Sequence, residues 1–114
     1  MDFKHYDSDK LKLYTGVGAE NVKYNFETNC LNKRKQHIRI PLINGFNGDN
    51  AEGFAEYFSQ FDTSDTVFEF LPYHEYGKEK WTSEYKLKDG FISKEQLNTF
   101  KDVFKSYKLK VTET

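Results

Sequence analysis

Short β-prone runs alternate with helical segments along this chain, and this alternation limits the possible folds more than any other feature. The runs at 1–6, 37–43 and 66–71 are apolar, or alternate apolar with polar residues, which is typical of strands. Between them, 19–33 and 50–61 repeat apolar residues every three or four positions, which predicts helices. Strands joined by helices at this spacing make right-handed crossovers and pair in parallel. The sequence therefore predicts an α/β fold.

Capping residues predict further elements near both ends of the chain. Asp7 can cap a short helix that Gly16 would end. Ser93 and Gln96 have the spacing of a capping box, which predicts a last helix with an apolar stripe. The segment 109–112 could add a final strand.

Length and composition predict one small domain with a packed core. The chain has 114 residues, and its eleven phenylalanines and eight tyrosines support such a core. The formal charge is -1, so nucleic acid and anionic membranes are not expected partners. Cys30 is the only cysteine, and by itself it cannot form an internal disulfide or hold an iron–sulfur cluster. No signal peptide is recognisable and no apolar run approaches the ~20 residues of a membrane span, so we expect a cytoplasmic protein.

A polar, aromatic segment follows the third predicted strand. Pro72 is expected to end that strand, because proline cannot donate a hydrogen bond to a sheet ladder. Pro41 likewise predicts that the second strand ends or bulges there. The residues after Pro72 are rich in side chains that can bind a ligand: Tyr73-His74-Glu75-Tyr76-Gly77-Lys78-Glu79-Lys80-Trp81. Because loops at the carboxyl ends of the strands hold the ligands of α/β proteins, His74 would stand at the mouth of a binding site.

Charged residues interrupt all three predicted strands, namely Asp2, Lys4, Arg39 and Glu69. Because residues two apart in a strand share a face, Asp2 and Lys4 are expected opposite Phe3 and His5. Unpaired buried charge is costly, so the charged groups must pair with one another or with a ligand. Two interpretations stay open here: ion pairs that tie the strands together, or a cavity that these groups line with His74. The histidines lack the spacing of a metal site.

Four segments carry a resemblance to a known family. They are Asp2-Phe3-Lys4-His5-Tyr6, Tyr14-Thr15-Gly16-Val17, Ile38-Arg39-Ile40-Pro41-Leu42-Ile43 and Phe70-Leu71-Pro72-Tyr73-His74-Glu75-Tyr76-Gly77-Lys78-Glu79-Lys80-Trp81. In this order they resemble the C-terminal half of the glycyl-radical-enzyme activating enzymes, the radical S-adenosylmethionine proteins related to pyruvate formate-lyase activating enzyme. The Leu-Pro-Tyr-His-x-x-Gly-Lys-x-Lys segment is the most specific part, and the resemblance covers 1–111.

The resemblance implies a fold, two cofactors and a partner. The fold would be part of a partial (β/α)6 barrel that binds S-adenosylmethionine and a [4Fe–4S] cluster. The 5′-deoxyadenosyl radical made there would abstract hydrogen from a glycine of a partner glycyl radical enzyme. By resemblance, four residues match positions that contact S-adenosylmethionine: Asp2, Lys4, Arg39 and His74. A loop facing the partner would include Tyr73, Tyr76, Lys78 and Trp81.

The departures from the family are as informative as the matches. The family holds its cluster with Cys-x3-Cys-x2-Cys, and neither this motif nor the glycine-rich cofactor segment occurs here. We therefore expect 1–114 to be a single incomplete domain whose cluster-binding N-terminal half is absent, and which is inactive alone unless a separate N-terminal half joins it. Two alternatives remain, a non-catalytic binding module and an inert truncated fragment.

Overall fold

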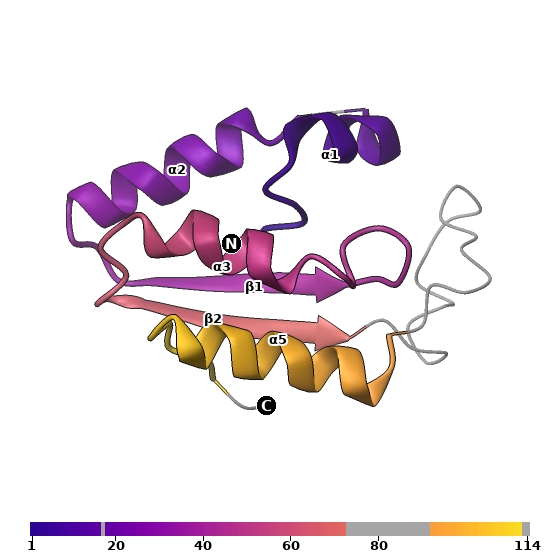
Figure 1. Ribbon diagram of the computed structural model, residues 1–114. Coiled ribbons are helices and arrows are strands. Elements are labelled where there is room, and N and C mark those ends of the chain that lie inside the picture. Colours follow the sequence, from indigo (N-terminus) through magenta and orange to yellow (C-terminus); the bar gives the residue numbers. More distant parts are fainter. Residues whose placement is uncertain (17, 73–91, 113–114) are drawn as a thin grey trace.

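The structure, a computed structural model, describes residues 1–16, 18–72 and 92–112 (Figure 1). Its elements in chain order are α1 (Ser8–Thr15), α2 (Glu20–Leu31), β1 (Gln36–Leu42), α3 (Ala51–Ser59), β2 (Thr66–Pro72) and α5 (Lys94–Ser106). From α2 to α5, helices and strands alternate as the sequence predicts, and the fold class is α/β.

The sheet is built from parallel segments. β1 and β2 pair in parallel over their full length. On the outer side of β1, Asp2 forms a single parallel bridge with Arg39, and on the outer side of β2, Val111 forms one with Phe68. The predicted strands at the two ends of the chain therefore flank the central pair, but each is joined to it by only one bridge.

Local signals set the helix ends where the sequence predicts them. The Asp7 side chain caps α1 by accepting a hydrogen bond from the Lys10 N–H, and Gly16 ends the helix in the left-handed conformation, with φ 79°. Ser93 and Gln96 form a complete capping box at the start of α5. α2 is shorter than predicted, because the chain leaves the helix before Lys33, which has φ 53°.

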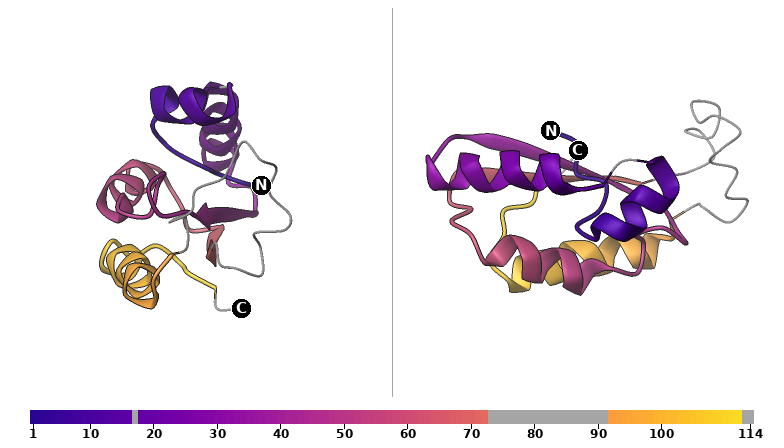
Figure 2. Two further views of the ribbon diagram at one scale, coloured as in Figure 1. Left: turned by 90° about the vertical axis from the view of Figure 1, so that its right-hand side faces the viewer. Right: turned by 90° about the horizontal axis from the view of Figure 1, so that it is seen from above.

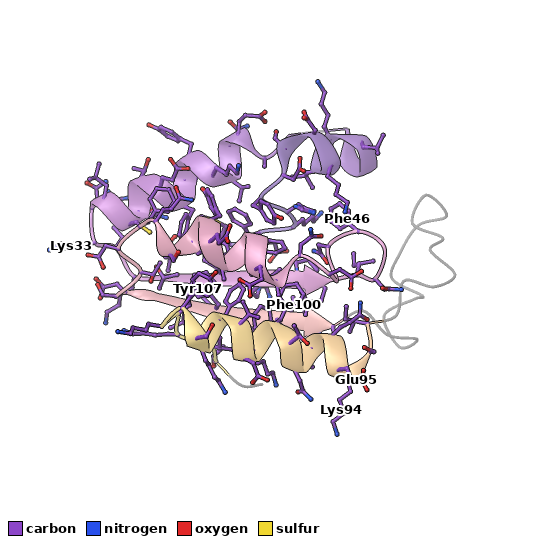
Figure 3. All side chains as sticks on the ribbon, viewed as in Figure 1. Lys33, Phe46, Lys94, Glu95, Phe100 and Tyr107 are labelled. Carbon is purple, nitrogen blue, oxygen red and sulfur yellow. The ribbon has the colours of Figure 1, made fainter. Side chains whose placement is uncertain are left out.

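The core lies between the sheet and the helices α2, α3 and α5, which cover one side of it (Figure 2). Phenylalanine rings dominate this layer and contact one another mostly edge to face. Phe100 lies in the layer between α3 and α5, whereas Lys94 and Glu95 in the first turn of α5 point away from it (Figure 3). The fully buried rings are Phe3, Phe26, Phe54, Phe58, Phe68, Phe100 and Phe104.

The opposite side of the sheet is its open face, which none of the described helices covers (Figure 2). Parallel sheets usually have both faces covered, so this feature sets the chain apart from an ordinary α/β domain. In the part of the chain that the structure describes, no helix is long and apolar enough to span a bilayer.

Candidate functional site

Alternation along the strands places charged side chains on the open face. In β1, Ile38 and Ile40 are fully buried on the helical side, whereas His37 and Arg39 between them are exposed. In the first segment (residues 1–6), Phe3 and His5 are buried and Asp2 and Lys4 are exposed, as the sequence predicts. The charged residues therefore share one face.

An ion pair and a histidine–carboxylate contact join these residues across the strands. Arg39 Nε lies 3.1 Å from Asp2 Oδ1, and both side chains are about half exposed, at 49% and 48%. His37 Nε2 lies 2.8 Å from Glu69 Oε1, and the Glu69 side chain is only 12% exposed. Arg39 stands opposite Glu69 in the β1–β2 register. The four side chains thus form one charged row across the first segment, β1 and β2.

This row contains features of both interpretations that the sequence left open. The pairs do tie strands together, which is the structural interpretation. Arg39, however, uses only its Nε atom, and its two terminal amino groups have no hydrogen-bond partner among the residues that the structure describes. A half-exposed guanidinium with free donors on a sheet face can still bind an anionic ligand.

Lys4 lies two residues beyond Asp2 along the first segment. Its side chain is exposed, and no contact joins its ammonium to another described residue. Its backbone carbonyl, in contrast, accepts a hydrogen bond of 2.8 Å from Asn47 Nδ2. Lys4 therefore has a fixed backbone and an exposed cation that no other residue of the described ranges engages.

The remaining residues that the sequence nominates lie outside the described part of the chain. This applies to His74 and to all four residues of the expected partner-facing loop, Tyr73, Tyr76, Lys78 and Trp81. Their roles stay predictions. Of the four expected cofactor contacts, the structure places Asp2, Lys4 and Arg39 on one face.

A hollow of about 550 Å³ opens at the amino ends of the strands. Its lining combines cationic, acidic and hydroxyl groups from both flanks of the β1–β2 pair and includes Lys35, His37, Asp65, Val67, Lys110 and Thr112. Since His37 also contacts Glu69, the hollow adjoins the charged row. Such a space can take part of a small polar ligand.

Cys30 is part of the core and not of this site. It is buried on α2, and its Sγ accepts a hydrogen bond of 3.3 Å from Gln36 Nε2. Burial raises the pKa of the Cys30 thiol, which keeps it protonated and unreactive. Among the described residues, no three histidine, cysteine or acidic side chains are grouped as metal ligands would be.

Two residues of this region were missed by the sequence analysis. His37 is two positions before Arg39 and shares its face, so the period of the strand could have identified it as a partner for Glu69. Asn47 is a different case. It lies in the turn after β1, and nothing in its sequence context indicates that it contacts Lys4, 43 residues away.

Comparisons with known proteins address the family. Models of known protein families give no match. In sequence, the chain is 33% identical over 84 residues to the choline trimethylamine-lyase activating enzyme of Oleidesulfovibrio alaskensis, covering 70% of this chain and 27% of that protein. In structure, it matches a domain of pyruvate-formate lyase-activating enzyme from Bacteroides vulgatus with a TM-score of 0.79 and 26% identity, covering 97% of this chain and 63% of that one. This chain resembles a glycyl-radical-enzyme activating enzyme.

The matches differ in how much of the chain they cover. A shorter similarity, 38% over 52 residues, is to the imidazole glycerol phosphate synthase subunit HisF of Staphylococcus aureus, and it covers 46% of this chain and 21% of that protein. The match to the activating-enzyme domain extends over nearly the whole chain, so it is the better guide. The chain spans about a quarter of the choline trimethylamine-lyase activating enzyme and less than two thirds of the solved domain.

Proposed function

We propose that this chain forms the C-terminal portion of a radical S-adenosylmethionine activating enzyme that generates a glycyl radical on a partner enzyme. One observation carries the proposal: the charged open face lies on a domain whose fold is similar to an activating-enzyme domain along nearly its whole length. The proposed site consists of Asp2, Lys4, Arg39 and His74.

The described residues fit the amino-acid end of S-adenosylmethionine. This end carries a carboxylate and an ammonium group close together. The ammonium of Lys4 and the half-exposed guanidinium of Arg39 suit the carboxylate, and the Asp2 carboxylate suits the ammonium group. His74 is proposed to contact the adenosine part, by resemblance alone. When bound to a reduced cluster, S-adenosylmethionine supplies the 5′-deoxyadenosyl group that removes hydrogen from the partner's glycine.

The same residues do not fit a [4Fe–4S] cluster. Such clusters are held by several cysteine thiolates, whereas this sequence has one cysteine and it is buried in the core. The cluster ligands must therefore come from residues other than these 114, and we propose that these residues alone are inactive. A separate N-terminal half, or a segment of the same polypeptide, would supply them.

The partner and the compartment are part of the proposal. We propose that a glycyl radical enzyme is the substrate, and that Tyr73, Tyr76, Lys78 and Trp81 face it. The reaction would take place in the cytoplasm. These points rest on the resemblance to the activating enzymes.

The test is binding of S-adenosylmethionine by isothermal titration calorimetry. We expect Lys4→Ala and His74→Ala each to weaken the affinity at least tenfold relative to the wild-type chain, since each removes a direct contact. Lys23→Ala is the matched control. This lysine is on α2, away from the open face, and its ammonium lies over the Tyr57 ring of α3. Unchanged affinity in both site variants would disprove the assigned site.

The radical chemistry needs a separate test. A segment carrying Cys-x3-Cys-x2-Cys would be co-expressed with this chain under anaerobic conditions, together with a glycyl radical enzyme. We expect a glycyl radical signal in electron paramagnetic resonance spectra only when both segments are present. A signal from the cluster-bearing segment alone would show that this chain is not needed.

A non-catalytic binding module is the second candidate, and the hollow favours it. A space of about 550 Å³ beside the charged row could hold a nucleotide-like ligand without any cluster. Binding of S-adenosylmethionine and of adenosine with equal affinity would support this module over the activating enzyme.

A further inference from the structure

The hydrogen-bond ladder between the first segment and β1 ends early. The Arg39 N–H donates to the Met1 carbonyl at 2.8 Å, and the Phe3 N–H donates to the Arg39 carbonyl at 2.7 Å. The backbone N–H and the backbone carbonyl of Arg39 thus both face the first segment. Backbone groups in a strand alternate in direction with a period of two, so position 41 faces the same way.

Pro41 explains why the ladder stops. It has no N–H, so the next bond toward the first segment, to the Phe3 carbonyl, cannot form. β1 nevertheless continues past Pro41, because that missing donor would not have faced β2. The sequence prediction that Pro41 would end the strand or cause a bulge is therefore wrong for the β1–β2 pair, and the interruption falls on the other side.

The side-chain amide of Asn47 joins the two segments just beyond this gap. Its Nδ2 donates to the Pro41 carbonyl at 2.7 Å and to the Lys4 carbonyl at 2.8 Å, which joins the two segments beyond the end of the ladder. Its Oδ1 accepts from the Ile43 N–H at 2.8 Å. The amide orientation is fixed, since a flipped amide would place an oxygen against two carbonyls.

Because Asn47 is buried, its three hydrogen bonds cannot be replaced by bonds to water. Asn47 is fully buried, and both of its amide hydrogens and its oxygen are used. A buried polar side chain that makes three bonds is costly to replace, because each lost partner leaves an unsatisfied group. The turn that carries it is closed by the Asn47 and Gly48 N–H groups, which both donate to the Ile43 carbonyl at 3.0 Å.

We propose that Asn47 is a positioning residue that acts through Lys4. Its bonds to the Lys4 and Pro41 carbonyls join the two segments beyond the last bond of the ladder, and so it holds the Lys4 backbone against β1 with the ammonium directed to the carboxylate end of S-adenosylmethionine. The inference rests on the proposed function, because it assumes that Lys4 contacts this ligand.

The test combines the variant Asn47→Asp with two measurements on the full chain. Replacing the amide nitrogen by oxygen removes both donors and keeps the size. Hydrogen–deuterium exchange of the peptide covering residues 1–6 reports whether the first segment is still held. Calorimetric titration with S-adenosylmethionine reports the ligand contact. Asn98→Asp, an identical change at an exposed position of α5, is the matched control.

We expect Asn47→Asp to raise exchange in residues 1–6 at least tenfold and to weaken the affinity at least tenfold, with Asn98→Asp unchanged in both. We also expect almost no further loss of affinity when Asn47→Asp is added to Lys4→Ala. A purely structural role would instead weaken binding by the same factor in both backgrounds.

The outcomes separate this inference from the proposed function. Unchanged exchange in residues 1–6, or raised exchange with unchanged affinity, overturns the positioning role. Additive loss in the double variant overturns it as well. If the wild-type chain does not bind S-adenosylmethionine while exchange rises as expected, the bridge to Lys4 stands and the proposed function fails. Should Asn47→Asp not fold, Asn47→Ser keeps one donor. The same changes in exchange and in affinity are then expected, with smaller factors.

Discussion

The two faces of the sheet are built from the same strands but differ in what their side chains contribute: one stabilises the fold and the other carries charged groups. On the helical face, phenylalanine rings from the strands and from three helices are fully buried against one another. On the open face, the same strands carry the half-exposed Asp2–Arg39 ion pair and the His37–Glu69 contact. Burial of apolar area stabilises a fold strongly, whereas exposed ion pairs contribute little. The helical face therefore holds the domain together and leaves the charges of the open face available for a ligand.

The clearest test of this division is to remove a ring from the helical face. Phe58 is fully buried, with ring centroids 4.7 Å from Phe68, 4.9 Å from Phe3 and 5.0 Å from Phe26. We expect Phe58→Ala to lower the free energy of unfolding by about 3–5 kcal/mol, measured by urea denaturation. Tyr24→Ala, on the exposed side of α2, should change it by less than about 0.5 kcal/mol. Similar losses in the two variants would contradict the division.

His5 brings a titratable group into the helical face, and its effect depends on pH. Desolvation by burial, followed by the positive charge of Lys10, lowers the pKa of His5 from 6.5 to about 4. Its Nδ1 accepts from the Asp7 N–H at 3.0 Å, and its buried Nε2 has no hydrogen-bond partner among the described residues. Above pH 6.5 the ring is neutral in both states. As the pH falls from 6.5 to about 4, only the unfolded chain gains the proton, so the folded state loses stability, in total about 3 kcal/mol.

The check is to follow the free energy of unfolding between pH 7 and pH 4 for the wild-type chain and for His5→Gln. The variant should lose about 3 kcal/mol less over this range, whatever its stability at pH 7. Equal slopes for wild type and His5→Gln would show that the buried ring does not titrate as proposed.

A substitution at the close contact between α3 and the first segment should have an intermediate effect on the free energy of unfolding. A side chain added at Gly53 would place its Cβ well inside van der Waals contact of the Tyr6 ring and hydroxyl oxygen. We therefore expect Gly53→Ala to cost about 1–3 kcal/mol in thermal or urea unfolding, because the ring must move. In a Tyr6→Ala background the same change should cost clearly less. An equal cost in both backgrounds would mean that Tyr6 is not the obstacle.

The smallest effect on stability is expected on the open face. Asp2→Asn and Arg39→Gln should each change the free energy of unfolding by about 0–1 kcal/mol, since the pair is half exposed. Both variants should nevertheless weaken S-adenosylmethionine binding, measured by calorimetry. A large loss of stability with intact binding would reverse the roles that we give to the two faces.

Much of the fold and part of the site could be predicted from the sequence. The capping residues Asp7 and Ser93 and the glycine at position 16 act on backbone groups within four residues, so their helix ends follow from local chemistry. Strand alternation placed Asp2, Lys4 and Arg39 on one face, because the period of two is intrinsic to an extended chain. Identification of the ligand came from resemblance and not from this pattern.

What the sequence by itself determined about this protein is the order of its elements, the capped starts of α1 and α5 and the face on which each strand residue lies. Only the tertiary structure decided which charges pair, that the described helices leave one sheet face open, and that Asn47 bridges the Lys4 and Pro41 carbonyls. The physical reason is the separation along the chain of the residues that interact. Caps and alternation depend on neighbouring residues, whereas pairing and bridging require segments about forty residues apart to meet in one register, and no local pattern encodes that meeting.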